Sequence, residues 1–357
     1  MSVQELAWEE VRSLRSARVD VEVADVTDFH QLDAPDQAAA DAAAAAMESD
    51  VVHGAGTLRQ SASMVTWTKF LTKAVSLHPL YSAATLACLG EGLGEDAFDI
   101  SLDLGRGRVM TARQALAAHK GQAAADQEID DYLAFIRAPF DDWCRFLFRG
   151  LPDGRGIRNR AAVAADLVIA HFAGSDRREL VSASLACGAA GPVYALVESL
   201  EARLGVLVTA VALVDIDVMA LASAFSLAQG TSVAGRVRLL QQNLLRGPLA
   251  GEGLPARSVH IADALGIIEY LPERLATALL ARVREELMAP GGVVVIGNML
   301  RHRPQTVFLQ GVVGWPPMHQ RDISTMLRLL DAAGYDVGRA RVRVTPDGVY
   351  AVYAVPV

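Results

Sequence analysis

The chain has 357 residues, of which 52% are hydrophobic and 21% charged, so a large buried core is expected and extensive disorder is not. Its formal net charge of −8 disfavours nucleic acid as substrate or partner, because no face rich in Lys and Arg would offset phosphate repulsion. No apolar run reaches the roughly 18 residues of a membrane span. The acidic start is not a secretory signal, and three scattered cysteines indicate a cytoplasmic protein without a disulfide framework or zinc.

Helical patterns dominate the first part of the chain. Apolar periodicity predicts helices at residues 8–15, 38–46, 61–77, 80–89, 112–118 and 130–148. A short hairpin is expected from residues 99–104 and 108–110. The turn residues 151–154 (LPDG) are the best domain boundary. We therefore predict a helical N-terminal lid or substrate domain over residues 1–154 and a second domain over residues 155–357.

Strands and helices alternate beyond this boundary. Buried, Val-rich runs predict strands at residues 180–185, 207–214, 237–240, 258–261 and 293–296. The helical runs between them and after them are residues 160–172, 192–204, 219–229, 272–287 and 321–333. Such alternation predicts an α/β fold, a parallel sheet with helices on both faces. Two last runs, 340–344 and 348–354, flank a Pro-Asp-Gly turn and predict a hairpin that adds an antiparallel edge.

The most informative stretch is an apolar strand that runs into a loop of six small residues, 186–191 (ACGAAG). Such a loop lets the backbone approach a ligand and directs free amide N–H groups at it. Asp215 ends the next strand, where a carboxylate can accept hydrogen bonds from a ribose diol. Only Gly188 and Gly191 keep the register of the dinucleotide fingerprint. The pattern therefore predicts a cofactor that contains a nucleoside but no pyrophosphate.

Motifs in the same order resemble those of class I S-adenosylmethionine-dependent methyltransferases. The resemblance covers about residues 156–357 and is carried by five segments: 184–188 (SLACG), 215–217 (DID), 243–245 (NLL), 266–271 (GIIEYL) and 290–298 (PGG…IGN). They are most similar to the bacterial branch that makes fatty-acid (3-hydroxypalmitate) methyl ester signals. The resemblance implies a Rossmann-like sheet, closed by the C-terminal hairpin, and S-adenosyl-L-methionine as cofactor.

The resemblance also implies a set of cofactor-binding residues. They are Ser184, Ala186, Cys187, Gly188, Asp215, Ile216, Asp217, Asn243 and Leu244. Asp217 could equally cap the following helix, and Cys187 is expected to fill space rather than to act as a nucleophile. Arg158 or Arg160 could hold the methionine carboxylate, unless both are solvated surface arginines.

On the acceptor side, Glu269, Tyr270 and Asn298 follow two strand ends, where ligands collect in such sheets. They could orient an acceptor or take its proton; a helix-terminal charge and a strand-ending turn are the structural alternatives. His260, on an apolar strand, is either a base or a core residue. The loop 315–319 (WPPMH) either walls the acceptor pocket or packs on the sheet.

The chain departs from the family pattern at three site positions. Ser184 stands where most class I enzymes carry an acid near the methionine amino group, Ala186 replaces a glycine, and Glu269 replaces the branch's Asp. We expect a transferase that acts on a small molecule, most simply a methyltransferase of secondary or signal metabolism. The alternatives are a cyclase that attacks the cofactor's own aminobutyl chain, and a catalytically silent binding module. The expected partners are a small-molecule acceptor, or the cofactor itself, and a second copy of the chain.

Overall fold

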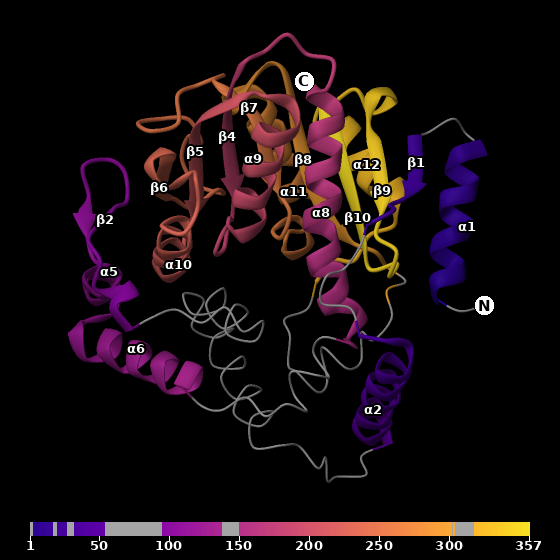
Figure 1. The fold of residues 1–357 in the computed structure, drawn as a ribbon, viewed down its shortest axis with the longest axis horizontal. Coiled ribbons are helices and arrows are strands. Elements are labelled where there is room, and N and C mark those ends of the chain that lie inside the picture. The colour runs from indigo at the N-terminus through magenta and orange to yellow at the C-terminus, as the bar shows by residue number, and fades with distance from the viewer. Residues whose placement is uncertain are drawn as a thin grey trace.

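The computed structural model describes residues 3–16, 20–26, 32–53, 95–137, 150–301, 303 and 318–357. These residues form an eight-stranded sheet with the order β1-β9-β10-β8-β7-β4-β5-β6, and helices cover both of its faces (Figure 1). The predicted α/β, Rossmann-like architecture is confirmed. Among the described helices, none is long and apolar enough to cross a membrane.

The element bounds follow the predicted order. The strands are β1 (Asp20–Val23), β2 (Leu102–Asp103), β3 (Val109–Met110), β4 (Glu179–Leu185), β5 (Leu207–Asp215), β6 (Val237–Gln241), β7 (Val259–Ala264), β8 (Met288–Met299), β9 (Arg341–Val344) and β10 (Tyr350–Pro356). The helices are α1 (Val3–Ser16), α2 (Ala34–His53), α5 (Ala112–Lys120), α6 (Gln122–Arg137), α8 (Pro152–Phe172), α9 (Gly191–Leu204), α10 (Val218–Ala228), α11 (Glu273–Arg282) and α12 (Ile323–Ala332). The predicted helices 61–77 and 80–89, and residues 138–148, lie outside the described residues.

The order of the central strands reverses between β4 and β7. From β4 the chain moves outward to β5 and β6, then crosses back to β7 and β8 on the other side of β4. All four of these neighbouring pairs are parallel. In such sheets, ligands bind outside the carboxyl ends of the strands at the point of reversal. The topology therefore directs attention to the ends of β4, β5 and β7.

The C-terminal hairpin does not form the edge of the sheet, as the sequence had suggested. β10 lies inside the sheet, antiparallel to both β8 and β9. The outer edge is β1, which pairs in parallel with β9 from Asp20 opposite Arg341 to Val23 opposite Val344. A segment of the predicted helical lid therefore completes the sheet of the C-terminal part. A strand of four residues, of which only Val21 is buried, carries too little periodicity to be found beforehand.

Two apolar layers hold the helices on the sheet. One contains α8, α9 and α10, with side chains such as Val168 and Leu213, and the other contains α11 and α12, with side chains such as Leu280 and Met326. Figure 1 shows α8 and α9 crossing one face. The predicted boundary 151–154 is the start of α8, with Pro152 in its first turn, where proline's missing N–H costs nothing.

The β2–β3 hairpin and helices α5 and α6 lie at the carboxyl-end edge of the sheet. The predicted hairpin 99–110 is β2 and β3, and the amide of Gln241, the last residue of β6, donates to the Leu104 carbonyl oxygen at 3.2 Å. Phe98 and Ile129 are buried in the same core cluster as α10 residues. The Gln37 amide of α2 donates to the Gly150 carbonyl oxygen at 2.7 Å, next to the start of α8. These contacts place α2, α5 and α6 below the sheet in Figure 1.

The fold predicts that replacing Gly297 on β8 by alanine destabilises the protein. An added Cβ would overlap the backbone carbonyl oxygen of Leu265, which cannot move without breaking the end of β7. We expect Gly297→Ala to lower the free energy of unfolding by about 1–3 kcal/mol, the usual cost of overpacking. Denaturant unfolding measures this, with Gly235→Ala as the control because nothing lies within 4 Å of its added Cβ. Equal stability of the two variants would contradict the close approach.

Candidate functional site

The small-residue loop after β4 is bent by residues in the left-handed backbone region. Ala186, Gly188 and Ala190 have φ angles of 54°, 55° and 59°. This conformation is costly for residues with a Cβ and free for glycine. The Cys187 amide donates to the carbonyl oxygen of Val214 on β5 at 3.2 Å, so the loop folds across the end of the neighbouring strand.

Asp215 fastens this loop to the end of β5. Its Oδ2 accepts a hydrogen bond from the Gly188 amide at 3.0 Å, and its Oδ1 accepts one from the Asp217 amide at 2.9 Å. The residue is buried, with an exposed fraction of 7%. A carboxylate is a hydrogen-bond acceptor only, which is the chemistry that the hydroxyl groups of a ligand require. The structure thus brings together the two residues on which the sequence argument depended.

Asp217 caps helix α10, one of the two interpretations left open. Its Oδ1 accepts from the Met219 amide at 2.8 Å, and its Oδ2 has no hydrogen-bond partner among the described residues. Burial first, and then the nearby carboxylate of Asp215, raise the pKa of Asp217; Glu128 of α6 adds to the effect. The pKa of the Cys187 thiol is also raised, chiefly by burial and by Asp215. A protonated thiol in the loop fits a space-filling residue better than a nucleophile.

The remaining cofactor-side residues follow β5 and β6. Ile216 is 45% exposed. Asn243 is half-buried and uses its Oδ1 to accept the Leu245 amide at 2.9 Å, while Leu244 is buried. The Gln242 amide donates to the Asp215 carbonyl oxygen at 2.8 Å, which ties the loop after β6 to the end of β5. The predicted residues of three strand ends therefore line one continuous edge.

One buried acid of this edge was missed by the sequence argument. Asp263 of β7 lies directly opposite Ser184 of β4 in the strand register, and Ser184 Oγ donates to Asp263 Oδ1 at 2.8 Å. Both are buried, at 5% and 2% exposure. Burial raises the pKa of Asp263 to about 7, against smaller lowering effects of the Ser184 hydrogen bond and of Arg160. A carboxylate inside an otherwise apolar strand was the available signal.

Glu269 lies in a buried polar cluster that joins three elements. The Tyr350 hydroxyl donates to Glu269 Oε1 at 3.3 Å, and Arg160 Nη1 of α8 lies 3.8 Å from the same oxygen. Arg160 Nη1 also donates to the Tyr350 hydroxyl at 2.9 Å and to the Leu265 carbonyl oxygen at 2.8 Å. Burial raises the pKa of Glu269, although Arg160 opposes the shift. Of the two candidate arginines, Arg160 is the one that the described contacts place in this cluster; Arg158 is half-buried on the same helix.

The other acceptor-side residues have mixed surroundings. Asn298 is fully buried and its Nδ2 donates to the carbonyl oxygens of Met299 and Arg321 at 3.0 and 2.9 Å, so it ties β8 to the segment before α12. Tyr270 is half-buried in the turn Ile268–Tyr270. Residues 315–317 of the expected pocket wall lie outside the described residues. His260 stands near the amino end of β7, where its Nδ1 accepts the Val181 amide at 3.0 Å.

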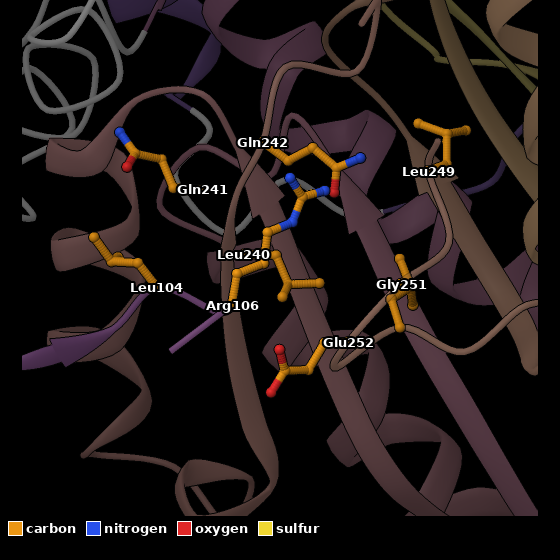
Figure 2. A pocket seen from close by; sticks show the side chains of 9 residues that line it. Leu104, Arg106, Leu240, Gln241, Gln242, Leu249, Gly251 and Glu252 are labelled. Carbon is orange, nitrogen blue, oxygen red and sulfur yellow. The ribbon is translucent and has the colours of Figure 1, made fainter. Parts of the chain in front are cut away.

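A small hollow lies beside this edge, between the β2–β3 hairpin and β6. Leu104, Arg106, Leu240 and Glu252 are among its lining residues (Figure 2). None of the predicted cofactor residues lines it, so it belongs to the packing of the hairpin and not to the site. Within the described part of the chain, no group of three or more His, Cys, Asp or Glu side chains is arranged to hold a metal ion.

Comparisons with known proteins show similarity in fold only. No family model and no curated protein matches the chain. A possible exported protein from Bordetella parapertussis is 16% identical, with a TM-score of 0.50 over 79% of this chain and 98% of that one. An O-methyltransferase family 2 protein from Planctomyces limnophilus, in complex with apigenin, is 14% identical, with a TM-score of 0.47 over 94% and 100%. Magnesium protoporphyrin IX methyltransferase from Synechocystis, with bound S-adenosylmethionine, is 14% identical, with a TM-score of 0.41 over 57% and 82%.

The burial of Asp263 predicts a dependence of stability on pH. Its pKa is about 7 in the folded chain and 3.8 in an exposed reference, so between these pH values the folded state holds a proton that the unfolded state has released. The stabilisation that comes from binding this proton more tightly in the folded state is complete below pH ~4 and is lost as the pH rises to ~7. Asp263→Asn does not titrate, and we therefore expect it to gain stability relative to the wild type between pH 5 and pH 8. Urea unfolding at pH 5 and pH 8 measures this. If the difference in unfolding free energy between the variant and the wild type is the same at both pH values, Asp263 is ionised throughout.

Proposed function

We propose that this protein is an S-adenosylmethionine-dependent transferase of small molecules, most simply a methyltransferase. The observation that carries the proposal is the pairing of Asp215 with the Gly188 amide at the reversal point of the sheet. It sets a carboxylate suited to a ribose diol beside a loop of small residues that a ligand can approach closely. The resemblance of the motifs to class I methyltransferases supports the choice of cofactor.

The neighbouring residues suit the parts of such a cofactor. Asn243 and Leu244, after β6, would lie beside the adenine, and Ile216 offers an exposed apolar side chain next to Asp215. Asp217 would support the ribose site through its helix cap and its unused oxygen. At the other end, Arg158 or Arg160 on α8 would hold the carboxylate of the methionine tail. Ser184, Ala186 and Cys187 would form the floor beneath the tail.

The N-terminal residues 1–154 would form the lid over the acceptor. Two contacts with the end of β6 support this role: the Gln241 amide donates to the Leu104 carbonyl oxygen at 3.2 Å, and Arg108 Nη1 donates to Gln241 Oε1 at 3.0 Å. A closed lid would exclude water from the reacting groups. The fatty-acid methyl ester branch, a second copy of the chain as partner, and a cytoplasmic location are part of the same proposal and rest on the sequence.

Methyl transfer requires little acid–base catalysis from the protein. The bound cofactor supplies a sulfonium that carries the methyl group and is itself the leaving group. The chain must hold an acceptor in line with that methyl group, and such positioning can supply several kcal/mol of the barrier reduction. Glu269, whose pKa is raised by burial, could accept a proton from an alcohol or amine acceptor, with Tyr350 and Arg160 holding its carboxyl group in place.

Removal of the Asp215 carboxylate should weaken cofactor binding. Charge-assisted hydrogen bonds contribute roughly 1.5–3 kcal/mol, so Asp215→Ala should raise the Kd for S-adenosylmethionine by about tenfold to a hundredfold. Calorimetry measures the Kd, and Asp166→Ala, which removes an exposed acid of α8, is the matched control. Unchanged affinity in Asp215→Ala would remove the cofactor assignment.

Product analysis separates the proposed function from its alternatives. We expect purified protein to form S-adenosylhomocysteine only when an acceptor such as 3-hydroxypalmitate is added, detected by mass spectrometry. Methylthioadenosine formed without any acceptor would instead identify a cyclase. Tight binding without turnover of any acceptor tested would favour a binding module.

Glu269→Gln should separate an acceptor-side role from a structural one. The glutamine keeps the size of the side chain but cannot take a proton. If Glu269 serves the acceptor, kcat should fall by about a hundredfold or more while the cofactor Kd stays the same. If it only supports Tyr350 and Arg160, thermal melts should change while kcat per folded enzyme does not. Steady-state kinetics and melts on the same preparation give both numbers.

A further inference from the structure

Asp263 is a buried acid with one oxygen left unused. Its Oδ1 accepts from Ser184, but its Oδ2 is buried and has no hydrogen-bond partner among the described residues. A buried polar atom without a partner costs free energy, and native structures usually pair such atoms. A donor from a ligand would remove this cost.

The position of Asp263 relates it to the proposed ligand. Ser184 and Asp263 face each other on β4 and β7, the two strands between which the strand order reverses. Ser184, which donates to Asp263, lies two residues before the small-residue loop, and Asp215 accepts the Gly188 amide inside that loop, so both acids lie beside it. Asp215 belongs to β5, on the opposite side of β4 from β7. A ligand whose ribose lies at Asp215 can therefore extend across β4 and end at Asp263.

We propose that Asp263, held by Ser184, binds the ammonium group of the cofactor's amino-acid tail. The inference rests on the proposed function, because it takes the ligand to be S-adenosylmethionine. The ligand carries two positively charged groups, a sulfonium and an ammonium. The unpaired Asp263 Oδ2 needs a hydrogen-bond donor, and only one of the two groups has one. An ammonium group has three N–H donors that can satisfy the unused oxygen, whereas a sulfonium has no hydrogen to donate. Ser184 would act as a positioning residue that keeps the carboxylate aimed at the tail.

Binding at Asp263 should be linked to proton release. The charged and titratable groups that interact with it are Arg160 from α8, which lowers its pKa, and the thiol of Cys187. Burial is the largest effect and brings the pKa to about 7, so the empty site holds a proton for part of the time at neutral pH. An ammonium favours the ionised carboxylate and expels that proton. Affinity should therefore rise from pH 5.5 to pH 7.0, below the pKa of an α-amino group at about 7.7.

Calorimetry with three ligands tests the assignment. S-adenosylmethionine and S-adenosylhomocysteine both carry the ammonium group, only the first carries the sulfonium, and methylthioadenosine has neither. At pH 7.0 we expect Asp263→Asn to weaken both tail-bearing ligands by about tenfold to a hundredfold and to leave methylthioadenosine unchanged. Ser184→Ala should weaken the same two ligands less. Ser182→Ala is the matched control. Ser182 is buried on the same face of β4 as Ser184 but lies two residues further from the loop, opposite Ile261 and not Asp263.

The outcomes decide between distinct conclusions. The proposal also expects the rise in affinity between pH 5.5 and pH 7.0 to disappear in Asp263→Asn. Unchanged affinity of that variant for S-adenosylhomocysteine, or a loss confined to S-adenosylmethionine, would overturn the assignment to the ammonium. An equal loss for methylthioadenosine would overturn it as well, because it would indicate a general distortion of the site. If the wild-type protein binds none of the three ligands, the proposed function itself fails.

Discussion

The carboxylate of Asp215 accepts hydrogen bonds from two backbone amides, one in the loop after β4 and one in the turn before α10. These bonds join the ends of two neighbouring strands to the starts of the helices that follow them. The loop needs such a connection because Ala186 and Ala190 adopt a left-handed conformation that is unfavourable for alanine. Without an acceptor at position 215, the Gly188 amide would lose its partner and the bend would have less to stabilise it. This one side chain therefore connects the loop after β4 to the turn after β5.

Buried acids gather along that edge. Asp215, Asp217, Asp263 and Glu269 are each less than one tenth exposed, and burial raises the pKa of the last three. Desolvation of a carboxylate is expensive, so a protein keeps such groups only where they are paired or used. The positive charge of Arg160 neutralises part of this negative charge, since Arg160 lies near Glu269 and lowers the pKa of Asp263. The negative charge that remains on these carboxylates suits a ligand with hydroxyl donors at one end and a positively charged group at the other.

Helix α8 connects this edge to the N-terminal part of the chain. Its first turn lies near Gly150 and α2, and its Asp153 forms a buried ion pair with Arg303, beyond the end of β8. Arg160, two turns along, reaches Leu265 and Tyr350. The same helix thus carries both the contacts to the N-terminal part and the arginine next to Glu269. The same helix packs on β8 and β10.

The sequence by itself determined the features that depend on near neighbours in the chain. Buried strands rich in valine, the small-residue loop and the acid after β5 could be read directly, because period, turn chemistry and strand ends are local properties. Tertiary structure alone decided the contacts between distant segments. Ser184 meets Asp263 across 79 residues, and Glu269 meets Tyr350 across 81, so no local pattern could pair them. The short strand β1 was likewise undecidable, since four residues pair with an edge only after β9 and β10 have created it.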